Sequence, residues 1–595
     1  MTFLGWLTIF LFVAILTALA IPLGSYMARV YSGERVFLTP LFAGPERLLY
    51  GIFRADPDRG QDWKQYAKSL ILFSLAGWLL LFIILRTQTL WDWTGLNPQG
   101  FHSAPWNVTF NTTSSFVTNT NWQFYGGETT MSYFSQMVGL TVQNWLSAGV
   151  GICVAIALIR GIVSRSGKGI GNFWADIVRT VLYVMTPICV IGALVLVSQG
   201  VIENFHGYLT AHTITGLTQG IAQGPVASQE VIKELGTNGG GFFNVNSAHP
   251  FENPNGFTNL FEMLLVLIIP AALIFTYGRM TGNRRQGYAI YGVMMFMFLG
   301  AVIVAYIAEA HGSPAQHHVG LHTHAIAGSS GGNMEGKEQR FGIAGSALFD
   351  VITTVTSCGA VNSAIESYTG IGGAVPMANI SASEVIFGGV GTGLYSILLY
   401  VLLAVFIGGL MVGRTPEWLG KKLEAREIKL AGLGILITPL AALLCTATGV
   451  ATKAGRSSIA EVATSKAGGH TPQGFSETFY AYLSQANNNG SAFAGYTGFI
   501  QPNAGNLGSH GVTLANLLGG FDMLVARFAP ILFALAVAGA LAGKRVTPAG
   551  LGTMRTDNTT FSILLIGVIV LVGALTFFPA LLLGPIVQGL TGHLY

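Results

Sequence analysis

Four short strings rich in threonine, asparagine and glycine recur along the chain at nearly regular intervals. They read TNTN at 118–121, TNGG at 237–240, TSCG at 356–359 and NNNG at 487–490. Successive strings begin 119, 119 and 131 residues apart, and each follows a long apolar segment and a short stretch of helical character. A period of this kind indicates that one structural unit is repeated four times. Four equivalent loops predict a pseudo-fourfold arrangement around one axis.

Composition places these units in a membrane. Of the 595 residues, 51% are hydrophobic and only 9% are charged, whereas ordinary soluble domains carry about 25% charged residues. Apolar runs long enough to cross about 30 Å of hydrocarbon lie near 4–27, 67–86, 134–159, 176–199, 257–278, 287–309, 380–412, 430–450, 512–541 and 561–587. We therefore expect an all-α polytopic membrane protein with about ten transmembrane helices in a single membrane domain, 1–595.

Basic residues gather in alternate connections between these runs. The connections near residues 28–66, 160–179, 279–285, 414–429 and 544–555 hold most of the 30 lysines and arginines. The positive-inside rule places these connections in the cytoplasm, and it places both termini and the four strings outside. No basic residue precedes the first run, so we expect an uncleaved first helix rather than a secretory signal.

The stretches that precede the strings predict short helices at 107–117, 225–236, 345–355 and 474–486. A helix that enters the membrane from outside and ends at a string directs its negative C-terminal end at the loop, which favours a cation there. Irregular backbone is tolerated at this depth where it lines a water-filled cavity, and rings of backbone carbonyls can replace the hydration shell of K⁺. Four external linkers are the alternative, but they leave the matched helices unexplained. The strings therefore predict a potassium filter.

Longer motifs around the strings resemble those of one known family. SFVTNTNWQ (115–123), LGTNGGGFFN (235–244), NSAHPFENP (246–254), TSCGAVN (356–362), GRTPEWLGKK (413–422) and ANNNGSAFAG (486–495) are similar to the potassium-binding subunit of the bacterial Kdp potassium-transporting ATPase, the KdpA family. The resemblance continues to GALTFFPALLLGP at 573–585. It implies four M1-P-M2 units like those of potassium channels and of Trk or Ktr transporters, with one extra helix at each end. We accordingly expect an extra N-terminal helix at 1–27, repeats at 67–165, 176–284, 287–415 and 430–545, and an extra C-terminal helix at 561–587.

The resemblance also assigns the ion-selecting residues of the filter. They are Thr118, Asn119, Thr120, Asn121, Thr237, Asn238, Gly239, Gly240, Gly241, Thr356, Ser357, Cys358, Gly359, Asn487, Asn488, Asn489 and Gly490. Gln123 matches a position that the family associates with ion selection and passage. In this alignment Asn121 stands where the other strings have Gly240, Gly359 and Gly490. Either its side-chain oxygen supplements the carbonyls, or the first loop adopts a different backbone.

The seventh apolar run contains a glycine-rich interruption, EVIFGGVGTGLYS at 384–396, with Gly388, Gly389, Gly391 and Gly393. Each interior glycine costs a helix roughly 0.5–1 kcal/mol relative to alanine, so several together predict a break. Close helix packing is one explanation, because small residues let helices approach. The resemblance favours another, a gating loop beneath the filter that blocks direct passage to the cytoplasm and diverts the ion sideways.

Two sets of charged residues remain. Arg527 lies well inside its apolar segment, where a charge is costly, and we expect it to pair with Glu384 or Asp522; a structural ion pair without a transport role is an equal alternative. The basic residues of the fourth basic connection satisfy the positive-inside rule. In the family this region also contacts the ATPase partner. The candidate partner-facing residues are Arg414, Lys421, Lys422, Arg426 and Lys429.

Histidines and cysteines give weaker signals. Gly and Ser flank the histidine-rich segment, and no carboxylate is close to it, so we interpret it as a solvated external insertion rather than a metal site. Its members are His311, His317, His318, His322 and His324. The four cysteines show no spacing typical of a disulfide framework or a zinc site.

The chain lacks the sequences that would power transport. It has no G-x-x-x-x-G-K-[ST] string and no DKTGT phosphorylation sequence, and SGKG at 166–169 does not fit the first of these patterns. We expect no catalytic site and no nucleotide on this chain, only K⁺ as the transported ligand. The family implies a P-type ATPase subunit, KdpB, together with KdpC and the small KdpF, in the bacterial inner membrane. The alternative function is a free-standing Trk-like potassium channel or symporter, since a membrane enzyme would need a convergent acid, base and nucleophile.

Overall fold

The computed structural model describes residues 1–165, 167, 169–321, 323, 324, 326, 331–411, 413, 416–456, 458, 459, 473–496, 510–547 and 554–590. Ten helical segments in these residues are long and apolar enough to cross a membrane. They are Phe3–Tyr31 (α1), Trp63–Arg86 (α3), Ser135–Val163 (η2 and α6), Phe173–Ser198 (α7, η3 and α8), Gly256–Met280 (α10), Arg284–His318 (α11 and α12), Thr392–Met411 (α15), Ala425–Ala451 (α16), Leu514–Ala542 (within α20, His510–Ala542) and Thr559–Leu590 (α21, η6 and α22). Each overlaps one predicted run, so the prediction of an all-α polytopic membrane protein is confirmed.

The composite spans are divided as η2 (Ser135–Thr141), α6 (Val142–Val163), α7 (Phe173–Arg179), η3 (Thr180–Met185), α8 (Thr186–Ser198), α11 (Arg284–His311), α12 (Pro314–His318), α21 (Thr559–Leu581), η6 (Leu582–Ile586) and α22 (Val587–Leu590). The shorter helices are α2 (Thr39–Phe53), η1 (Gln88–Thr94), α4 (Trp106–Val117), α5 (Gly127–Thr130), α9 (Val226–Leu235), η4 (Asn246–Ala248), α13 (Gly342–Val355), η5 (Ile365–Ser367), α14 (Gly370–Ser381), α17 (Lys453–Arg456) and α19 (Gly474–Ala486). Two antiparallel hairpins complete the described part: β1 (Leu209–His212) with β2 (Thr218–Ile221), and β3 (Glu417–Trp418) with β4 (Lys421–Lys422).

Several long helices begin at residues that satisfy their free amide groups. The Asp62 side chain accepts hydrogen bonds at the start of α3, Asn255 does so at the start of α10, and Glu424 opens α16 with a capping box. In each case a side chain three residues later accepts a hydrogen bond from the backbone amide of the cap residue. Such boxes fix where a helix starts, because they satisfy amide groups that have no partner inside the helix.

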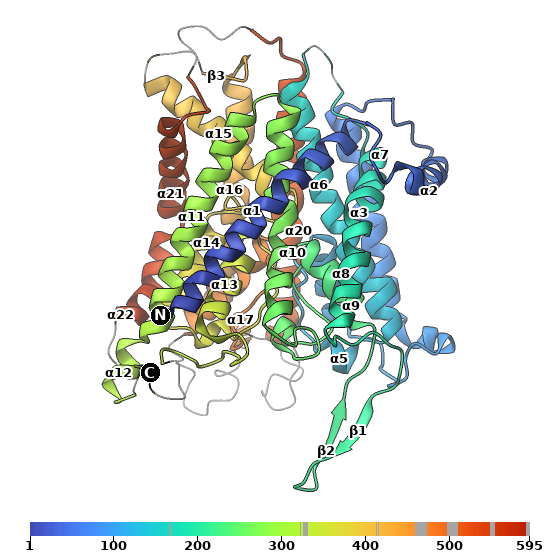
Figure 1. The fold of residues 1–595 in the computed structure, drawn as a ribbon, viewed down its shortest axis with the longest axis vertical. Coiled ribbons are helices and arrows are strands. Elements are labelled where there is room, and N and C mark those ends of the chain that lie inside the picture. Colours follow the sequence, from blue (N-terminus) through green and yellow to red (C-terminus); the bar gives the residue numbers. More distant parts are fainter. Residues whose placement is uncertain are drawn as a thin grey trace.

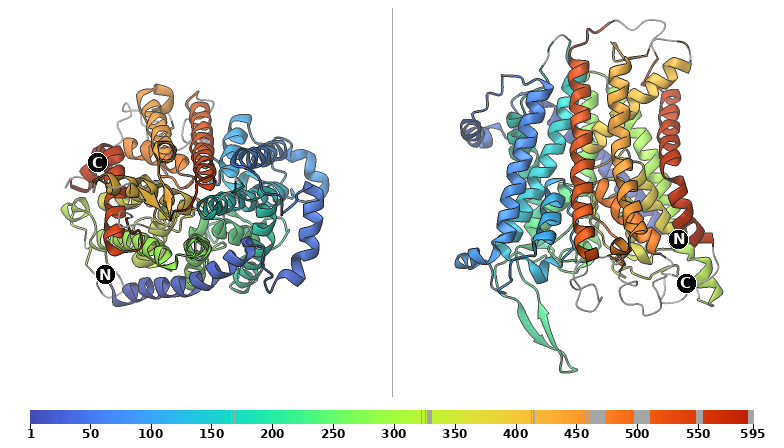
Figure 2. Two further views of the ribbon diagram at one scale, coloured as in Figure 1. Left: turned by 90° about the horizontal axis from the view of Figure 1, so that it is seen from above. Right: turned by 180° about the vertical axis from the view of Figure 1, so that it is seen from behind.

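A long helix, a short helix and a second long helix occur four times in succession. The sets are α3, α4 and α6; α8, α9 and α10; α11, α13 and α15; and α16, α19 and α20. The short helices α9 and α13 occupy the half of the bundle that also holds the N-terminus, α22 and the β1–β2 hairpin, and β3 lies at the opposite end (Figure 1). Seen from above, the cyan, green, yellow and orange parts of the chain follow one another around the bundle (Figure 2).

The centre of the bundle is formed by the inner helices of these sets. In the apolar windows of η2–α6 and α10, 83% and 78% of the residues are buried, against 28% in α1 and in the α21–α22 segment. α1 packs along α10, and α21 packs along α15 and α11. The first and last helices are therefore peripheral, and the rest of the chain leaves most of their surface uncovered.

The seventh predicted run, 380–412, is interrupted at its glycines, as expected, but the helix before the break begins earlier than predicted. α14 begins at Gly370 and ends at Ser381, and α15 starts at Thr392. Residues 382–391 between them are irregular. The glycines and the proline of α14 weaken its helical signal in the sequence, yet most of this helix is buried, and tertiary packing stabilises it.

Candidate functional site

All four short helices end in the same backbone motif. One residue after the helix cap, the backbone is left-handed, at Asn119 (φ 72°), Thr237 (φ 47°), Ser357 (φ 51°) and Asn488 (φ 56°). The next residue donates its amide to a carbonyl five positions back, from Thr120 to Ser115, Asn238 to Lys233, Cys358 to Thr353 and Asn489 to Ser484, at 2.8–2.9 Å. This is the Schellman arrangement, which turns the chain sharply at a helix end. Each helix therefore directs its C-terminal end at a string.

The hydrogen bonds show that α9 ends one residue earlier, relative to its string, than the other three short helices. The residues that cap the helices are Thr118, Gly236, Thr356 and Asn487. The expected alignment holds at the end of the strings, because Asn121, Gly240, Gly359 and Gly490 all have left-handed backbones. The second string therefore has one more residue than the others between its helix cap and this position.

Backbone carbonyls from the strings converge on one another. An atom at the Cβ position of Gly239 would lie 2.9 Å from the carbonyl oxygens of Thr120 and Cys358 and 2.7 Å from that of Asn489. One point therefore lies within 3 Å of oxygens from the three other strings. Gly359 and Gly490 likewise leave no room for a side chain, because the carbonyls of Asn489 and Thr120 stand against them.

Side chains join the strings into a closed ring. Asn119 donates its amide to the carbonyl of Thr237 at 3.0 Å, and the Cys358 thiol donates to the carbonyl of Asn238 at 3.0 Å. Asn489 donates to the carbonyl of Thr353, at the end of the third short helix, at 2.9 Å. Thr120 closes the ring by donating its hydroxyl to the side-chain oxygen of Asn488 at 3.4 Å. The amide and hydroxyl groups of the strings thus hold neighbouring loops together.

Asn121 adopts the same handedness as the glycines at its equivalent positions. Its φ is 54°, against 73° at Gly240, 87° at Gly359 and 97° at Gly490. Its side-chain nitrogen donates to Asn144 of α6 at 2.5 Å. Of the two alternatives for this position, a different backbone conformation is therefore wrong. A supplementary role for its side-chain oxygen stays a prediction.

A vestibule of about 630 Å³ adjoins one side of the ring. Its walls include the last residues of the strings, Asn121, Gly240, Gly359 and Gly490, together with Gln123, Glu128 and Glu338. The α5 helix, which contributes to this wall, lies at the same end of the bundle as the N-terminus (Figure 1). Burial raises the pKa of the Glu128 carboxyl above its usual value. The walls thus carry oxygen-rich groups that suit a cation.

The side chain of Gln123 both donates a hydrogen bond to the second string and accepts one from it. Its side-chain nitrogen donates to the carbonyl of Gly241 at 3.1 Å, and its side-chain oxygen accepts the Gly241 amide at 3.2 Å. The two partners are 118 residues apart in the chain. The structure therefore places Gln123 and Gly241 together at the vestibule entrance to the ring.

The irregular segment 382–391 lies against the opposite side of the ring. The amide of Val390 donates to the Thr237 hydroxyl at 2.9 Å, and the amide of Gly388 donates to the carbonyl of Val355 at 2.9 Å. Gly388 (φ 62°) and Gly391 (φ 91°) have left-handed backbones, and Gly391 also stands against the carbonyl of Gly151 in α6. Gly389 and Gly393 lie close to other parts of the chain, where a side chain has little room. A Cβ at Gly389 would lie 3.3 Å from the Thr237 hydroxyl, and one at Gly393 would overlap the carbonyl of Phe387.

Arg527 does not pair with the carboxylates that were expected. It donates to the Thr392 hydroxyl at 2.7 Å, and in the described part of the chain no ion pair joins it to Glu384 or Asp522. Glu384 accepts the side-chain amide of Asn488 at 3.2 Å instead. Glu384, Thr392 and Asn488 share a small cavity of about 20 Å³ below the fourth string. The expected direct ion pair is therefore not formed among the described residues, although Arg527 lies close enough to Glu384 to interact with it electrostatically.

The candidate partner-facing basic residues separate into two kinds. Lys422, Arg426 and Lys429 are exposed. Lys421 is buried, and its ammonium donates to the carbonyls of Gly161 and Leu541 at 3.0 and 2.7 Å, near the ends of α6 and α20. Lys421 is thus not partner-facing, because it satisfies helix C-termini, whose partial negative charge favours a cation. Arg414 lies outside the described residues.

The histidine-rich segment contains no metal-binding cluster among its described members. His311, His317, His318 and His324 are exposed, and the ring of His317 contacts the carbonyl of His311 at 3.0 Å. His322 lies outside the described residues.

A buried charged group behind the second string was not anticipated from the sequence. Its members are Glu230, Lys233 and Glu234 of α9, Glu252 of the following loop and Glu262 of α10, all at most 1% exposed. The spacing of the three α9 residues places them on one face of the helix. That spacing was a usable signal, but Glu252 and Glu262 could be assigned only from the fold.

Comparisons with known proteins agree along almost the entire chain. The family model described as "Potassium-transporting ATPase A subunit" matches residues 10–590. A protein of Mesorhizobium japonicum is 51% identical over 590 residues, with 99% of each chain covered, and one of Rhizobium rhizogenes is 51% identical over 591 residues, again with 99% of each covered. One of Methylobacterium radiotolerans is 50% identical over 592 residues, covering 100% of this chain and 98% of the relative. All three are named potassium-transporting ATPase potassium-binding subunit. Among solved structures, the potassium transporter TrkH from Vibrio parahaemolyticus is similar at 14% identity and a TM-score of 0.48, over 76% of this chain and 84% of that one.

Proposed function

The chain belongs to the potassium-transporting ATPase A subunit family, and on that premise we propose that it selects K⁺ from outside at the four strings and passes it to a P-type ATPase subunit. Its relatives carry the name of a potassium-binding subunit. The proposal adds the site of binding, the route of the ion and the division of labour with the partner.

The observation that carries the proposal is the convergence of carbonyl oxygens from Thr120, Cys358 and Asn489 near Gly239. Carbonyl oxygens can replace the water that a K⁺ ion loses when it leaves solution. The partial negative charge at the ends of α4, α9, α13 and α19 adds attraction for a cation. Hydrogen bonds between neighbouring strings keep the oxygens in place without the ion, so little reorganisation accompanies binding.

The two sides of the ring support a direction of movement. K⁺ enters from the vestibule, past Gln123, and the segment 382–391 acts as a gate on the other side. The gate is supported by the hydrogen bond from Val390 to Thr237, which ties the segment directly to the second string at 2.9 Å. An ion that reaches this point must turn sideways or wait until the segment moves.

Energy for uptake comes from the partner in this proposal. We expect the complex to contain KdpB as the phosphorylated ATPase, with KdpC and KdpF, and this chain to contribute ion selection alone. The membrane potential supplies about 2.3 kcal/mol per charge per 100 mV, which limits how far an unpowered channel can concentrate K⁺. ATP hydrolysis by the partner removes this limit.

Reconstitution tests the proposal against the channel alternative. The complex, purified from its native membrane, should contain an ATPase whose activity K⁺ stimulates, with Rb⁺ substituting better than Na⁺. The isolated chain in vesicles should bind K⁺ but show no ATP-driven uptake and little conductance. Steady potassium currents through the isolated chain, driven by an applied potential, would instead support a free-standing channel.

A further inference from the structure

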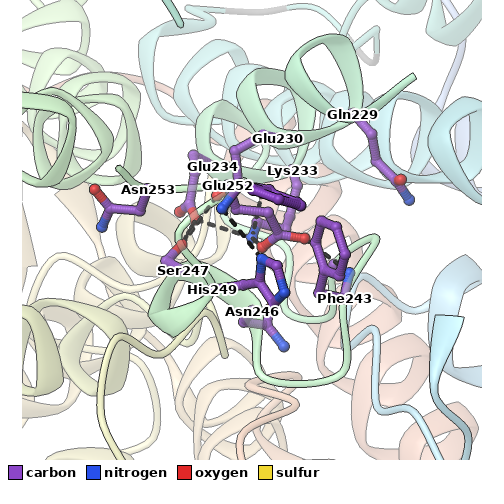
Figure 3. Close-up of polar contacts among 12 residues, drawn as sticks. Gln229, Glu230, Lys233, Glu234, Phe243, Asn246, Ser247, His249, Glu252 and Asn253 are labelled. Atoms are coloured by element: carbon purple, nitrogen blue, oxygen red, sulfur yellow. Dashed lines mark hydrogen bonds and ion pairs between the residues drawn. The ribbon is translucent and has the colours of Figure 1, made fainter. Parts of the chain in front are cut away.

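A single buried lysine lies among the carboxylates behind the second string (Figure 3). The ammonium of Lys233 lies 2.7 Å from a carboxylate oxygen of Glu230, 3.3 Å from one of Glu234 and 3.5 Å from one of Glu252. Ser247 donates its hydroxyl to Glu230 at 2.9 Å and to Glu234 at 3.2 Å. The ammonium is thus the positive charge around which three carboxyl groups are arranged.

The same residues hold the second string from the helix that precedes it. The backbone carbonyl of Lys233 accepts the amide of Asn238 at 2.9 Å, and that of Glu234 accepts the amide of Thr237 at 3.1 Å. The Glu234 carboxylate lies 3.6 Å from the Cys358 thiol, which itself donates to the carbonyl of Asn238. The charged end of α9 is therefore in contact with the second and third strings.

Glu252 holds the string from its other end. One of its oxygens accepts the amide of Phe243 at 2.9 Å, and both lie close to the backbone of Gly241. Its second oxygen is the one 3.5 Å from the Lys233 ammonium. The contact between Lys233 and Glu252 therefore bridges the end of α9 and the segment 241–243, with the whole second string between them.

This bridge distinguishes the second string from a similar buried pair near the third. Lys337 also has a buried ammonium, 2.7 Å from Glu309, and its ammonium lies over the Tyr368 ring at 4.0 Å. Its ammonium contacts Glu309, Glu335 and Tyr368 but none of the string residues. Lys337 is therefore a matched control. Its substitution removes a buried charge that does not contact the ring.

We propose that Lys233 is a positioning residue for ion selection, which holds the second string at the spacing that favours K⁺ through its bridge to Glu252. The proposal rests on the proposed function of the strings and adds a residue that does not touch the ion. Burying an ammonium among carboxylates is costly unless the geometry is well satisfied, and a rigid string is the benefit that this arrangement provides. A string released at one end could adapt to the smaller Na⁺ ion.

The test uses the complex purified with its ATPase partner. The half-saturating concentrations of K⁺, Rb⁺ and Na⁺ for ATPase stimulation are measured for the wild type, Lys233→Met, Lys233→Arg, Glu252→Gln and Lys337→Met. For Lys233→Met we expect the half-saturating K⁺ concentration to rise about tenfold or more and the preference for K⁺ over Na⁺ to fall by a similar factor, with a smaller change in maximal rate. Lys233→Arg should restore part of the preference, because it keeps the charge. Lys337→Met should lower the thermal midpoint of the complex and leave the ion preference unchanged.

Glu252→Gln keeps the proposal testable if Lys233→Met fails to assemble. Its oxygen still accepts the Phe243 amide, but its attraction to the ammonium is lost, so we expect the same change in preference at a smaller amplitude. Wild-type ion preference in assembled Lys233→Met or Glu252→Gln complexes would overturn the positioning role, as would an equal loss of preference in Lys337→Met. If K⁺ does not stimulate even the wild-type complex, the proposed function of the chain fails, and that outcome differs from the failure of Lys233 as a positioning residue.

Discussion

The carbonyl oxygen of Asn489 in the fourth string lies 2.7 Å from the place where a Cβ atom of Gly239 would stand. Gly239 therefore has no room for a side chain, because the obstructing atoms are backbone and cannot rotate away. Gly239→Ala should displace at least one string. We expect the half-saturating K⁺ concentration for ATPase stimulation to rise at least about tenfold, which corresponds to about 1.4 kcal/mol of binding free energy.

Gly292→Ala is the control for this change. Gly292 lies in α11, it is exposed, and an added Cβ would meet nothing within 4 Å. The same substitution there should leave K⁺ stimulation unaltered. A Gly239→Ala complex with wild-type K⁺ affinity would contradict the placement of the filter at the four strings.

Gly391→Ala tests the segment 382–391 as a gate. Gly391 has a left-handed backbone (φ 91°) and stands against the carbonyl of Gly151, so alanine there should be both strained and obstructed. We expect Rb⁺ binding to the complex to stay near wild type while transport changes several-fold, since the segment is disturbed and the strings are not. Binding of radioactive Rb⁺ and flux into vesicles measure the two quantities separately.

Gly389→Ala serves as the comparison, because its nearest obstruction is a hydroxyl at 3.3 Å. Its effect on transport should be smaller than that of Gly391→Ala. A parallel loss of binding and transport in Gly391→Ala would favour simple helix packing over a gate.

The number of spans could be predicted from the sequence, and the details of the ring could not. Twenty apolar residues in a row have few alternatives in a membrane, so each run contains one spanning helix. The end of α9 is fixed by the hydrogen bond from the amide of Asn238 to the carbonyl of Lys233, and LGTNGGG contains several positions that could end a helix. Helix ends depend on local hydrogen bonds that composition does not specify.

Tertiary partners account for the other differences. A count of basic residues identified the connection that contains Lys421, but it could not show that this lysine turns inward to the carbonyls of α6 and α20. The role of Lys233 could not be predicted either, since its partner Glu252 lies 19 residues further along the chain, beyond the string. Buried charges of this kind become visible only when the fold brings their partners together.

His249 should make the vestibule side of the protein sensitive to acid. Its ring stacks on Phe243 with centroids 3.7 Å apart and accepts the amide of Phe251. Burial, and secondarily the nearby Arg340, lower the pKa of His249 from 6.5 to about 4. Between pH 6.5 and about 4 the unfolded chain therefore binds a proton that the folded chain does not, so stability falls as the pH falls through this window. Partial exposure limits the loss to roughly 1–2 kcal/mol.

His249→Asn should flatten this dependence, because its side-chain oxygen can accept the same amide without titrating. The thermal midpoints of both proteins are compared at pH 7 and pH 5, and the wild type should lose more than the variant. An equal loss in both would assign the acid sensitivity to other groups.

The exposed basic residues of β4 and of the first turns of α16 should govern association with the ATPase partner. Lys422, Arg426 and Lys429 face solvent in the described structure, whereas Lys421 is buried. Replacing the three exposed residues with glutamate should weaken co-purification of the ATPase. The difference from the wild type should be larger at low ionic strength, because added salt screens the attraction that the wild-type residues provide. Lys421→Met should instead lower the free energy of unfolding by about 1.5–3 kcal/mol for a lost charged hydrogen bond, which appears as a lower thermal midpoint, and leave the yield of the assembled complex per folded chain unchanged. Retention of the partner by the triple variant at low salt would show that the basic surface serves membrane orientation alone.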